Sequence, residues 1–231
     1  KKIETLILNK KLLLQSQKLN YKNFEFDHKY ISSLIDAVRD TFAFNKRIFT
    51  QKNHSFKIMH ITNLNERFDG RLHYNTGRRL NNGFIRNGHN VLTLSDRDII
   101  HNYKSLKDFS GKQTLQNKIV ESFNNFKPDI VILGHADRVL NSTLSKMKDI
   151  NKNVIFSQWF LDPLSKFGPD HKSNSKRILD KVNFLDTTFL TTDPSALSIN
   201  IPNSYFMPNP ADNSFETLSN FNKNCPFDVF F

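Results

Sequence analysis

Asp129-Ile130-Val131-Ile132-Leu133 is the stretch of this sequence that decides the fold. Its four consecutive apolar residues lack the polar alternation of a half-exposed strand, and such runs are typical of strands that a parallel sheet buries on both faces. Other short apolar runs that we expect to be strands lie at 56–61, 90–94, 154–156, 188–191 and 205–207. Apolar residues at helical spacing occupy stretches between them, at 76–87, 115–126, 140–150 and 175–182. Strands that alternate with helices predict an α/β fold, a Rossmann-like, doubly wound parallel sheet with right-handed crossovers.

The composition narrows the class of protein. With 231 residues, 38% hydrophobic residues and 22 Phe, the chain is globular and is neither disordered nor fibrous. A formal net charge of +11 favours anionic partners such as phosphates, nucleic acid or a membrane surface. The single cysteine, Cys225, excludes a disulfide framework and a multi-cysteine zinc site. No apolar run approaches the ~20 residues that span a bilayer. The first residues also lack the apolar core of a signal peptide, so we expect a cytoplasmic protein.

The domain organisation is expected to have an extension and a main domain. Residues 1–55 carry apolar side chains at near-helical spacing among lysines, which predicts a helical N-terminal extension. Such a face could pack against its own domain or lie on an anionic membrane. Residues 56–224 hold the alternating strands and helices of the Rossmann-like domain. Because the chain begins with Lys1 and ends in an apolar run, 227–231, without a turn signal, we expect it to be a fragment.

Ligands of such sheets bind beyond the carboxyl ends of the strands, so the loops after the strands are where we expect the chemistry. The loop after the first strand, 63–75, lacks the G-x-G-x-x-G turn of dinucleotide enzymes, which disfavours an NAD-type site. The loop is instead cationic, and Thr76 could cap the helix that follows, so its free N–H groups would favour an anion. The same cations could equally form a solvated surface. They are Arg67, Arg71, His73, Arg78 and Arg79.

Two further loops carry candidate catalytic or sugar-binding groups. His135 follows the third strand and could act as a general base, with Asp137 to orient or charge it, or could simply hydrogen-bond to the loop backbone. After the fourth strand, Trp159 and Asp162 suit a sugar, whose C–H faces stack on a ring while its hydroxyls donate to the acid. Trp159 could equally belong to the core.

Several other chemistries lack their sequence signatures. The eight histidines are scattered without an H-E-x-x-H motif, and Asp96 and Asp98 flank Arg97 without forming a known cation loop, so we expect no metal site. A G-x-S-x-G nucleophile elbow is absent, which argues against an α/β-hydrolase.

Three segments resemble the N-terminal domain of GT-B glycosyltransferases. The stretch Gly83-Phe84-Ile85-Arg86-Asn87-Gly88-His89-Asn90-Val91 is similar to the helix and G-H-x-V turn that lead into the second strand of that domain. Lys127-Pro128-Asp129-Ile130-Val131 matches the approach to the third strand. Tyr205-Phe206-Met207-Pro208-Asn209-Pro210-Ala211-Asp212 is similar to the P-N-x-x-D segment before the interdomain linker. The chain resembles most the family-1/4-type bacterial enzymes, including the CgeB-like group, over residues 56–231.

The resemblance implies a metal-independent, two-domain enzyme that transfers a sugar from a nucleotide-diphosphate donor to an acceptor, with no further cofactor. Residues 225–231 would then begin a truncated C-terminal domain that binds the donor. The resemblance places the catalytic base at His135 or Asp137, with Asp162 as the alternate. The acceptor contacts that it implies are Asp69, Gly70, Arg71, His73, Arg78 and Trp159. Because Asp69-Gly70 stands where retaining members have paired glycines, retaining and inverting chemistry both stay open.

The implied partners are the nucleotide-sugar donor and a carbohydrate or lipid-linked acceptor. A basic N-terminal half would help such an enzyme approach an anionic membrane, so we also expect a peripheral contact at the inner membrane surface. The alternative is a non-catalytic Rossmann-like module that binds an anionic partner, either nucleic acid or a membrane surface. The sequence has no RNP-type aromatic motif and no helix-turn-helix, so we do not expect nucleic acid.

Overall fold

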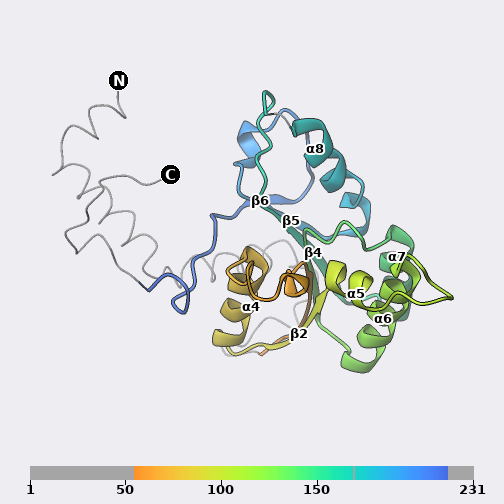
Figure 1. Ribbon diagram of the computed structural model, residues 1–231. Helices are drawn as coiled ribbons and strands as arrows, with labels where there is room; N and C mark the ends of the chain where they lie inside the picture. The colour runs from red at the N-terminus through yellow and green to blue at the C-terminus, as the bar shows by residue number, and fades with distance from the viewer. Residues whose placement is uncertain (1–54, 169, 218–231) are drawn as a thin grey trace, which may run out of the picture. The chain divides into compact units, whose positions relative to one another are not determined.

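The computed structural model describes residues 55–168 and 170–217 of the chain (Figure 1). Of these, residues 55–168 and 170–210 belong to one compact unit. Of a second unit the structure describes only residues 211–217, a turn in which the Asp212 carboxylate accepts a hydrogen bond from the Ser214 N–H (2.8 Å). The predicted helices before residue 55 and the predicted strand at 227–231 lie outside the described residues, so the domain boundaries stay a prediction.

A parallel sheet of six strands forms the centre of the compact unit, in the order β2-β1-β3-β4-β5-β6. Every pair of neighbouring strands is parallel, which confirms the α/β, doubly wound fold. The strands are β1 (Lys57–Thr62), β2 (Asn90–Ser95), β3 (Ile130–Gly134), β4 (Ile155–Phe160), β5 (Thr187–Leu190) and β6 (Ser204–Phe206).

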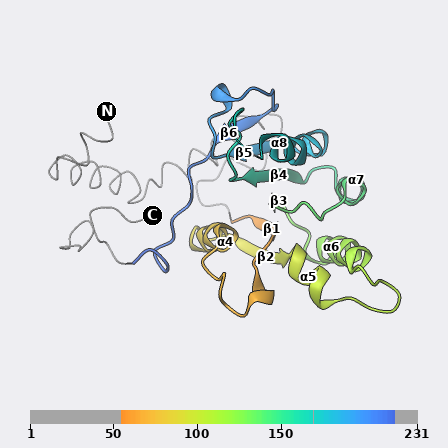
Figure 2. The same cartoon turned by 45° about the horizontal axis from the view of Figure 1, so that its top comes forward.

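Helices cover both faces of this sheet. The chain runs outward from β1 to β2 and then returns past β1 to β3, so right-handed crossovers place the first helix on one face and the later ones on the other. Figure 2 shows α4 on one side of the strands and α6, α7 and α8 on the other. The helices are α4 (Thr76–Arg86), α5 (Asp96–Asn102), α6 (Lys112–Phe126), α7 (Asn141–Ile150) and α8 (His171–Leu179), with short 3-10 turns η1 (Glu66–Phe68), η2 (Val182–Phe184) and η3 (Pro194–Ala196).

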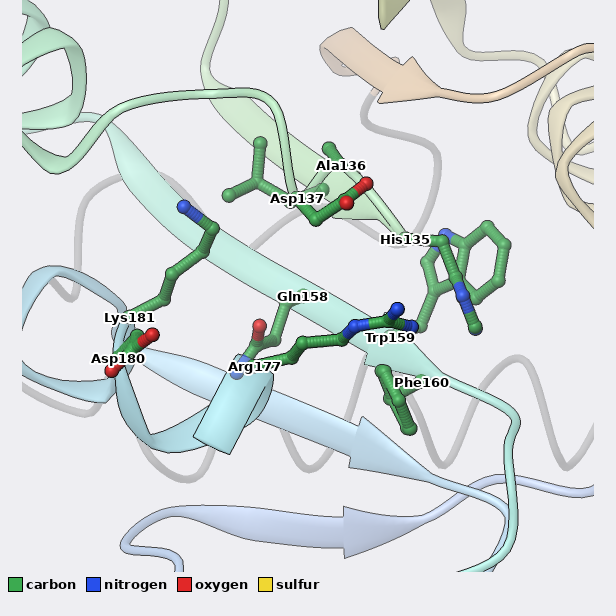
Figure 3. Close-up of a pocket in the computed structure, with 10 residues that line it drawn as sticks. His135, Ala136, Asp137, Gln158, Trp159, Phe160, Arg177, Asp180 and Lys181 are labelled. Carbon is green, nitrogen blue, oxygen red and sulfur yellow. The ribbon is translucent and has the colours of Figure 1, made fainter. Parts of the chain in front are cut away.

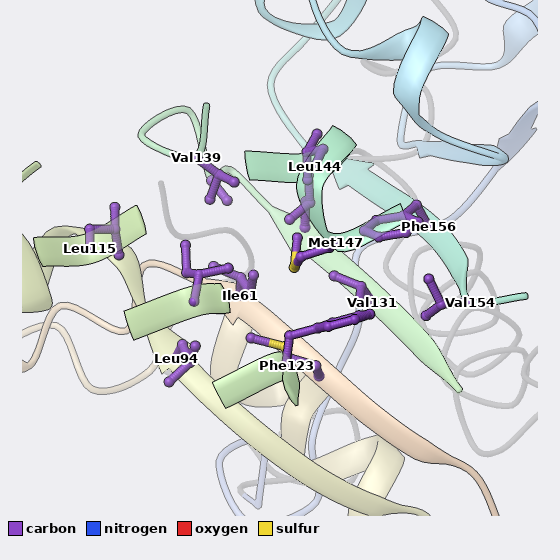
Figure 4. Close-up of a cluster of buried hydrophobic side chains, with 14 of the residues drawn as sticks. Ile61, Leu94, Leu115, Phe123, Val131, Val139, Leu144, Met147, Val154 and Phe156 are labelled. Carbon is purple, nitrogen blue, oxygen red and sulfur yellow. The ribbon is translucent and has the colours of Figure 1, made fainter. Parts of the chain in front are cut away.

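The face under α5, α6 and α7 holds the main apolar core (Figure 4). Met59 and Ile61 of β1 and Phe156 of β4 are fully buried there against the helices. A smaller cluster, in which Ile178 of α8 packs on Phe160 and Leu190, extends the core toward β5. Burial of apolar side chains at roughly 25 cal/mol per Å² makes this face the main source of folding stability.

The face under α4 is also buried, and it holds a group of hydrogen-bonded polar side chains. The Trp159 indole N–H donates to Nε2 of His60 (3.1 Å), and Nδ1 of His60 lies 3.4 Å from Oδ1 of Asn81 on α4. Because the indole can only donate, Nε2 must accept, so Nδ1 carries the proton and donates to Asn81. Burial lowers the pKa of His60 to about 4, against a small opposing effect of the Asn81 hydrogen bond. His60 is therefore neutral and holds the indole in one orientation.

Three local predictions need correction. The fourth strand continues to Phe160, so Trp159 lies within it and not in the loop after it. The helix α5 had no counterpart among the predicted elements. The cap of α4 is Asn75, whose side chain accepts a hydrogen bond from the Arg78 N–H, and Thr76 is the first helical residue.

Candidate functional site

The carboxyl ends of the strands meet at one edge of the sheet, and the chain reverses its direction of progress between β1 and β3. In doubly wound sheets this reversal opens a crevice in which ligands bind. A pocket lies at this edge, at the ends of β3 and β4 (Figure 3). It is lined by Leu133, His135, Ala136, Asp137, Gln158, Trp159, Phe160, Arg177, Asp180 and Lys181. The pocket thus brings together His135, Asp137 and Trp159 from the predicted set.

The backbone turns sharply at His135, which has a left-handed conformation (φ 51°) directly after β3. Its ring stacks on Phe160, with 4.6 Å between centroids and 5° between planes. The Leu161 N–H donates to Nε2 of His135 at 3.3 Å, so the hydrogen bond to loop backbone that we considered as an alternative is present. With Nε2 accepting, the proton of the neutral ring is on Nδ1, which lies 3.9 Å from the Asp162 carboxylate.

The electrostatic surroundings keep His135 neutral. Burial is the largest cause and lowers the pKa of His135, while the negative charge of Asp162 opposes the shift. The cations Arg177 and Arg97 lower the pKa further. At neutral pH the ring is therefore a neutral hydrogen-bonding group with its proton directed toward Asp162.

Asp137 is bound by arginines. Its carboxylate accepts a hydrogen bond from Arg97 (2.9 Å) and lies 3.6 Å from Nε of Arg138. Burial alone would raise the pKa of Asp137, but the Arg97 hydrogen bond and the neighbouring positive charges outweigh burial and hold the pKa below its usual value. The His135 imidazole pairs with Asp162, so the sequence neighbour Asp137 is not the carboxylate that faces the imidazole. A carboxylate held in this way accepts a proton poorly.

Asp162 is the more accessible acid at this edge. Its side chain is 44% exposed, and it lies 4.0 Å from Nη1 of Arg177 as well as 3.9 Å from His135. Arg177 reaches from α8 into the pocket toward His135 and Trp159 (Figure 3). The acid, the imidazole and the guanidinium together form a polar rim over the ring of Phe160.

The floor of the pocket depends on a close contact between β3 and β4. A Cβ added to Gly134 would lie 2.1 Å from the indole of Trp159, so only glycine lets this ring pack directly on the backbone of β3. Trp159 is 4% exposed and its N–H is bound to His60. Trp159 is therefore buried, as the core interpretation expected, and it also lines the pocket, while its contact with a sugar stays a prediction.

Sequence reasoning did not single out Lys181, a buried cation in the pocket wall. Its Nζ donates to the Val139 carbonyl (2.6 Å) and lies 3.5 Å from Oδ1 of Asn141. Burial lowers the pKa of Lys181, and the nearby Asp137, Asp180 and Asp96 oppose the shift. The only available signal was its spacing of four residues from Arg177, which is too common in helices to mark a site.

The predicted acceptor contacts of the first loop lie apart from the pocket lining. Asp69 (φ 51°) and Gly70 (φ 83°) form an exposed turn, and the Arg71 guanidinium lies over the ring of Phe68 at 5.5 Å. His73 is also exposed. Arg78 lies 3.9 Å from Glu66. None of these residues lines the pocket of Figure 3.

Asp98 explains why the first loop takes this shape. Its carboxylate accepts hydrogen bonds from the backbone N–H groups of Glu66 and Arg67 and from the Arg67 guanidinium (2.8 Å). Arg67 is therefore committed to a structural ion pair. Across residues 55–168 and 170–217, no group of three His, Cys, Asp or Glu side chains is placed to hold a metal ion.

Comparison with known proteins gives no relative for this chain. No family model, no curated protein and no solved structure matches it. Within the described part of the chain, none of the helices combines the length and the apolar character needed to cross a membrane.

Proposed function

We propose that the pocket at the ends of β3 and β4 binds a sugar acceptor, and that the protein transfers a sugar to it from a nucleotide-diphosphate donor. One observation carries the proposal. His135, Asp137 and Trp159, which the GT-B resemblance implies as site residues, line one pocket, and the alternate base Asp162 lies 3.9 Å from the imidazole. The pocket also lies at the edge where doubly wound sheets bind their ligands.

The contacts favour Asp162 as the proton acceptor. Asp137 is neutralised by Arg97, and the lone pair of His135 is used by the Leu161 N–H, whereas the Asp162 carboxylate is exposed at the rim. His135 would then direct its Nδ1–H toward Asp162 and hold the carboxylate in place as a positioning residue. This division of roles deepens the sequence prediction, which gave the base to His135 or Asp137 first.

In the proposed reaction the acceptor hydroxyl gives its proton to Asp162 and its oxygen forms a bond to the anomeric carbon of the donor. The bond from that carbon to the diphosphate oxygen breaks, and the nucleoside diphosphate leaves. General base catalysis of this kind typically contributes about 10²- to 10⁴-fold to the rate. The pocket would orient the acceptor through Gln158, Arg177 and Asp180, because hydroxyl-rich ligands need several convergent polar groups.

The test is the release of nucleoside diphosphate from a panel of uridine, guanosine and thymidine diphosphate sugars by the whole gene product. We expect one donor to be consumed, and Asp162→Asn to lower turnover about 10²-fold or more. The control is Asp149→Asn, the same chemical change at an exposed position of α7, which should leave turnover unchanged. If the wild-type protein consumes none of the sugars, the transferase proposal fails and a non-catalytic binding module takes its place.

A further inference from the structure

The loop between α5 and α6, residues 103–111, carries apolar side chains that point into solvent. Leu106 is 87% exposed, Phe109 77% and Tyr103 49%. The loop projects beyond α5 and α6 in both views (Figures 1 and 2, yellow-green). Single exposed apolar residues are common on protein surfaces, but a projecting loop with three of them in seven residues marks an interaction surface.

Hydrogen bonds within the loop and to α6 hold the loop in a defined conformation, and this conformation exposes its apolar side chains. Ser105 and Asp108 exchange two backbone hydrogen bonds of 3.1 Å, which leaves Leu106 and Lys107 at the tip of a tight turn. The Asp108 carboxylate accepts from the N–H (2.7 Å) and the hydroxyl (2.9 Å) of Thr114 on α6. Gly111 (φ 69°) permits the close return to α5, since a Cβ there would lie 2.3 Å from the Ile100 carbonyl oxygen.

The charge around the loop is positive. Between residues 99 and 120 the sequence has four lysines and a single acid, Asp108. Hydrogen bonds, first of all from the Thr114 backbone, hold the pKa of Asp108 below its usual value, and they fix its carboxylate toward α6. The lysines are Lys104, Lys107, Lys112 and Lys118. A hollow at the base of the loop is lined by Ile100, Lys112 and three arginines. Because Arg67 is paired with Asp98 and Arg97 with Asp137, the positive charge of the loop comes from its lysines.

We propose that this loop inserts Leu106 and Phe109 into the interfacial region of an anionic membrane, while the lysines around them contact lipid phosphates. Apolar side chains flanked by flexible cations are what peripheral insertion requires, because the long lysine chains keep their charges in the headgroup layer. The contact also fits a membrane better than a protein. Three side chains on one turn offer far less than the roughly 800 Å² per partner of a stable protein interface.

The loop and the pocket lie at the same edge of the sheet. Gln116, in the second turn of α6, donates to the Arg138 carbonyl (2.9 Å) and accepts from the Leu140 N–H, so the start of α6 is joined to the segment that follows His135. If the sugar transfer proposed above holds, membrane contact would present the pocket to lipid-linked acceptors. The membrane contact itself does not depend on that function, and it is tested without turnover.

The experiment is co-sedimentation of the full chain with vesicles of phosphatidylcholine alone and of phosphatidylcholine mixed with phosphatidylglycerol. We expect binding to the anionic vesicles only, with affinity that falls as salt is added. Lys104→Gln with Lys107→Gln should weaken binding about fivefold per lysine, at the usual contribution of a cation near an anionic surface. Leu106→Ser with Phe109→Ser should weaken it by roughly tenfold or more.

The matched control is Ile85→Ser with Ile150→Ser, which removes apolar side chains of 52% and 45% exposure. These residues end α4 and α7, so they lie toward the amino ends of the strands. This control should bind like the wild type. Equal binding to both kinds of vesicle, or unchanged binding of the Leu106 and Phe109 variant, overturns the proposal. So does a chain that is dimeric in solution and becomes monomeric in that variant, because the loop would then join two copies.

Discussion

The two faces of strand β1 differ in what fills the space beside them. Met59 and Ile61 point to the side of α6 and α7, where they belong to the main apolar cluster. His60, between them in sequence, is equally buried on the α4 side, but it is held by hydrogen bonds to Trp159 and Asn81. The apolar face depends on side chains whose volumes fill the space without gaps. The polar face depends on hydrogen bonds whose donors and acceptors must point at one another. Trp159 belongs to the polar face and also lines the pocket. We therefore expect substitutions on the polar face to change the geometry of the pocket as well as to lower stability.

The largest effect is expected on the apolar face. Phe156→Ala removes a fully buried ring of β4 and should lower the free energy of unfolding by about 3–5 kcal/mol. Phe156→Leu keeps most of the volume and should cost clearly less. Denaturant unfolding measures both. Equal losses for the two variants would show that volume is not what this face requires.

The contact between Gly134 and Trp159 allows a test of the polar face. Gly134→Ala forces a Cβ against the indole and should lower stability by about 1–3 kcal/mol. Because Trp159 is the single tryptophan, its emission reports the displacement of the ring. Gly83→Ala on α4 meets no atom within 4 Å and should leave emission unchanged. An unshifted emission in Gly134→Ala would contradict the packing of the pocket floor.

His60→Leu preserves volume but leaves the buried Trp159 N–H without its acceptor, while the Asn81 carbonyl keeps its hydrogen bond from the Thr93 hydroxyl. The unpaired indole N–H should cost about 1–3 kcal/mol at pH 7. The pKa of His60 is lowered to about 4, so the unfolded chain binds a proton at this position before the folded chain does. As pH falls from 6.5 toward 4, the wild type therefore loses stability that the variant keeps, by up to roughly 3 kcal/mol. Denaturation at several pH values should show the gap between the two proteins narrowing over this window.

Asp96 should respond to pH in the opposite way. Burial raises the pKa of Asp96 to about 6, and its Oδ2 is buried without a hydrogen-bond partner among the described residues. The folded protein therefore holds a proton that the unfolded chain releases, and this residue adds stability as pH falls through 6. Asp96→Asn removes the charge and should stabilise the protein by up to roughly 3 kcal/mol at pH 7, at about 1.4 kcal/mol per unit of pKa difference. The gain should vanish near pH 4, and a gain that is independent of pH would contradict this explanation.

The sequence predicted the sheet because most strands are apolar runs, and it failed where a buried strand is polar. Ser157 and Gln158 interrupt the apolar run of β4, yet both are buried because Thr187 and Thr188 of β5 hydrogen-bond to them. Such pairing depends on residues thirty positions away, which local pattern cannot reveal. The short helix α5 was missed for a simpler reason, since seven residues do not establish a helical period.

The site was predictable in part. His135 and Trp159 meet because carboxyl ends of adjacent strands share one edge, a rule that needs only strand order. The acid that faces His135 is Asp162 and not its sequence neighbour Asp137, because Arg97 of α5 and the adjacent Arg138 bind Asp137. Arg177 and Lys181 enter from α8 and from the residues just after it, and their sequence pattern is that of any basic helix.

The measurement that tests the central claim most directly is the emission of Trp159 as candidate sugar acceptors are titrated into the full chain. Because this tryptophan lines the pocket, an acceptor that enters should change its emission in a saturable way, and the apparent affinity should fall in Asp162→Asn and Arg177→Gln. We expect the acceptor that changes the emission to be also the one that accepts the transferred sugar. A protein that transfers sugar to an acceptor while the Trp159 emission stays constant would contradict the assignment of this pocket.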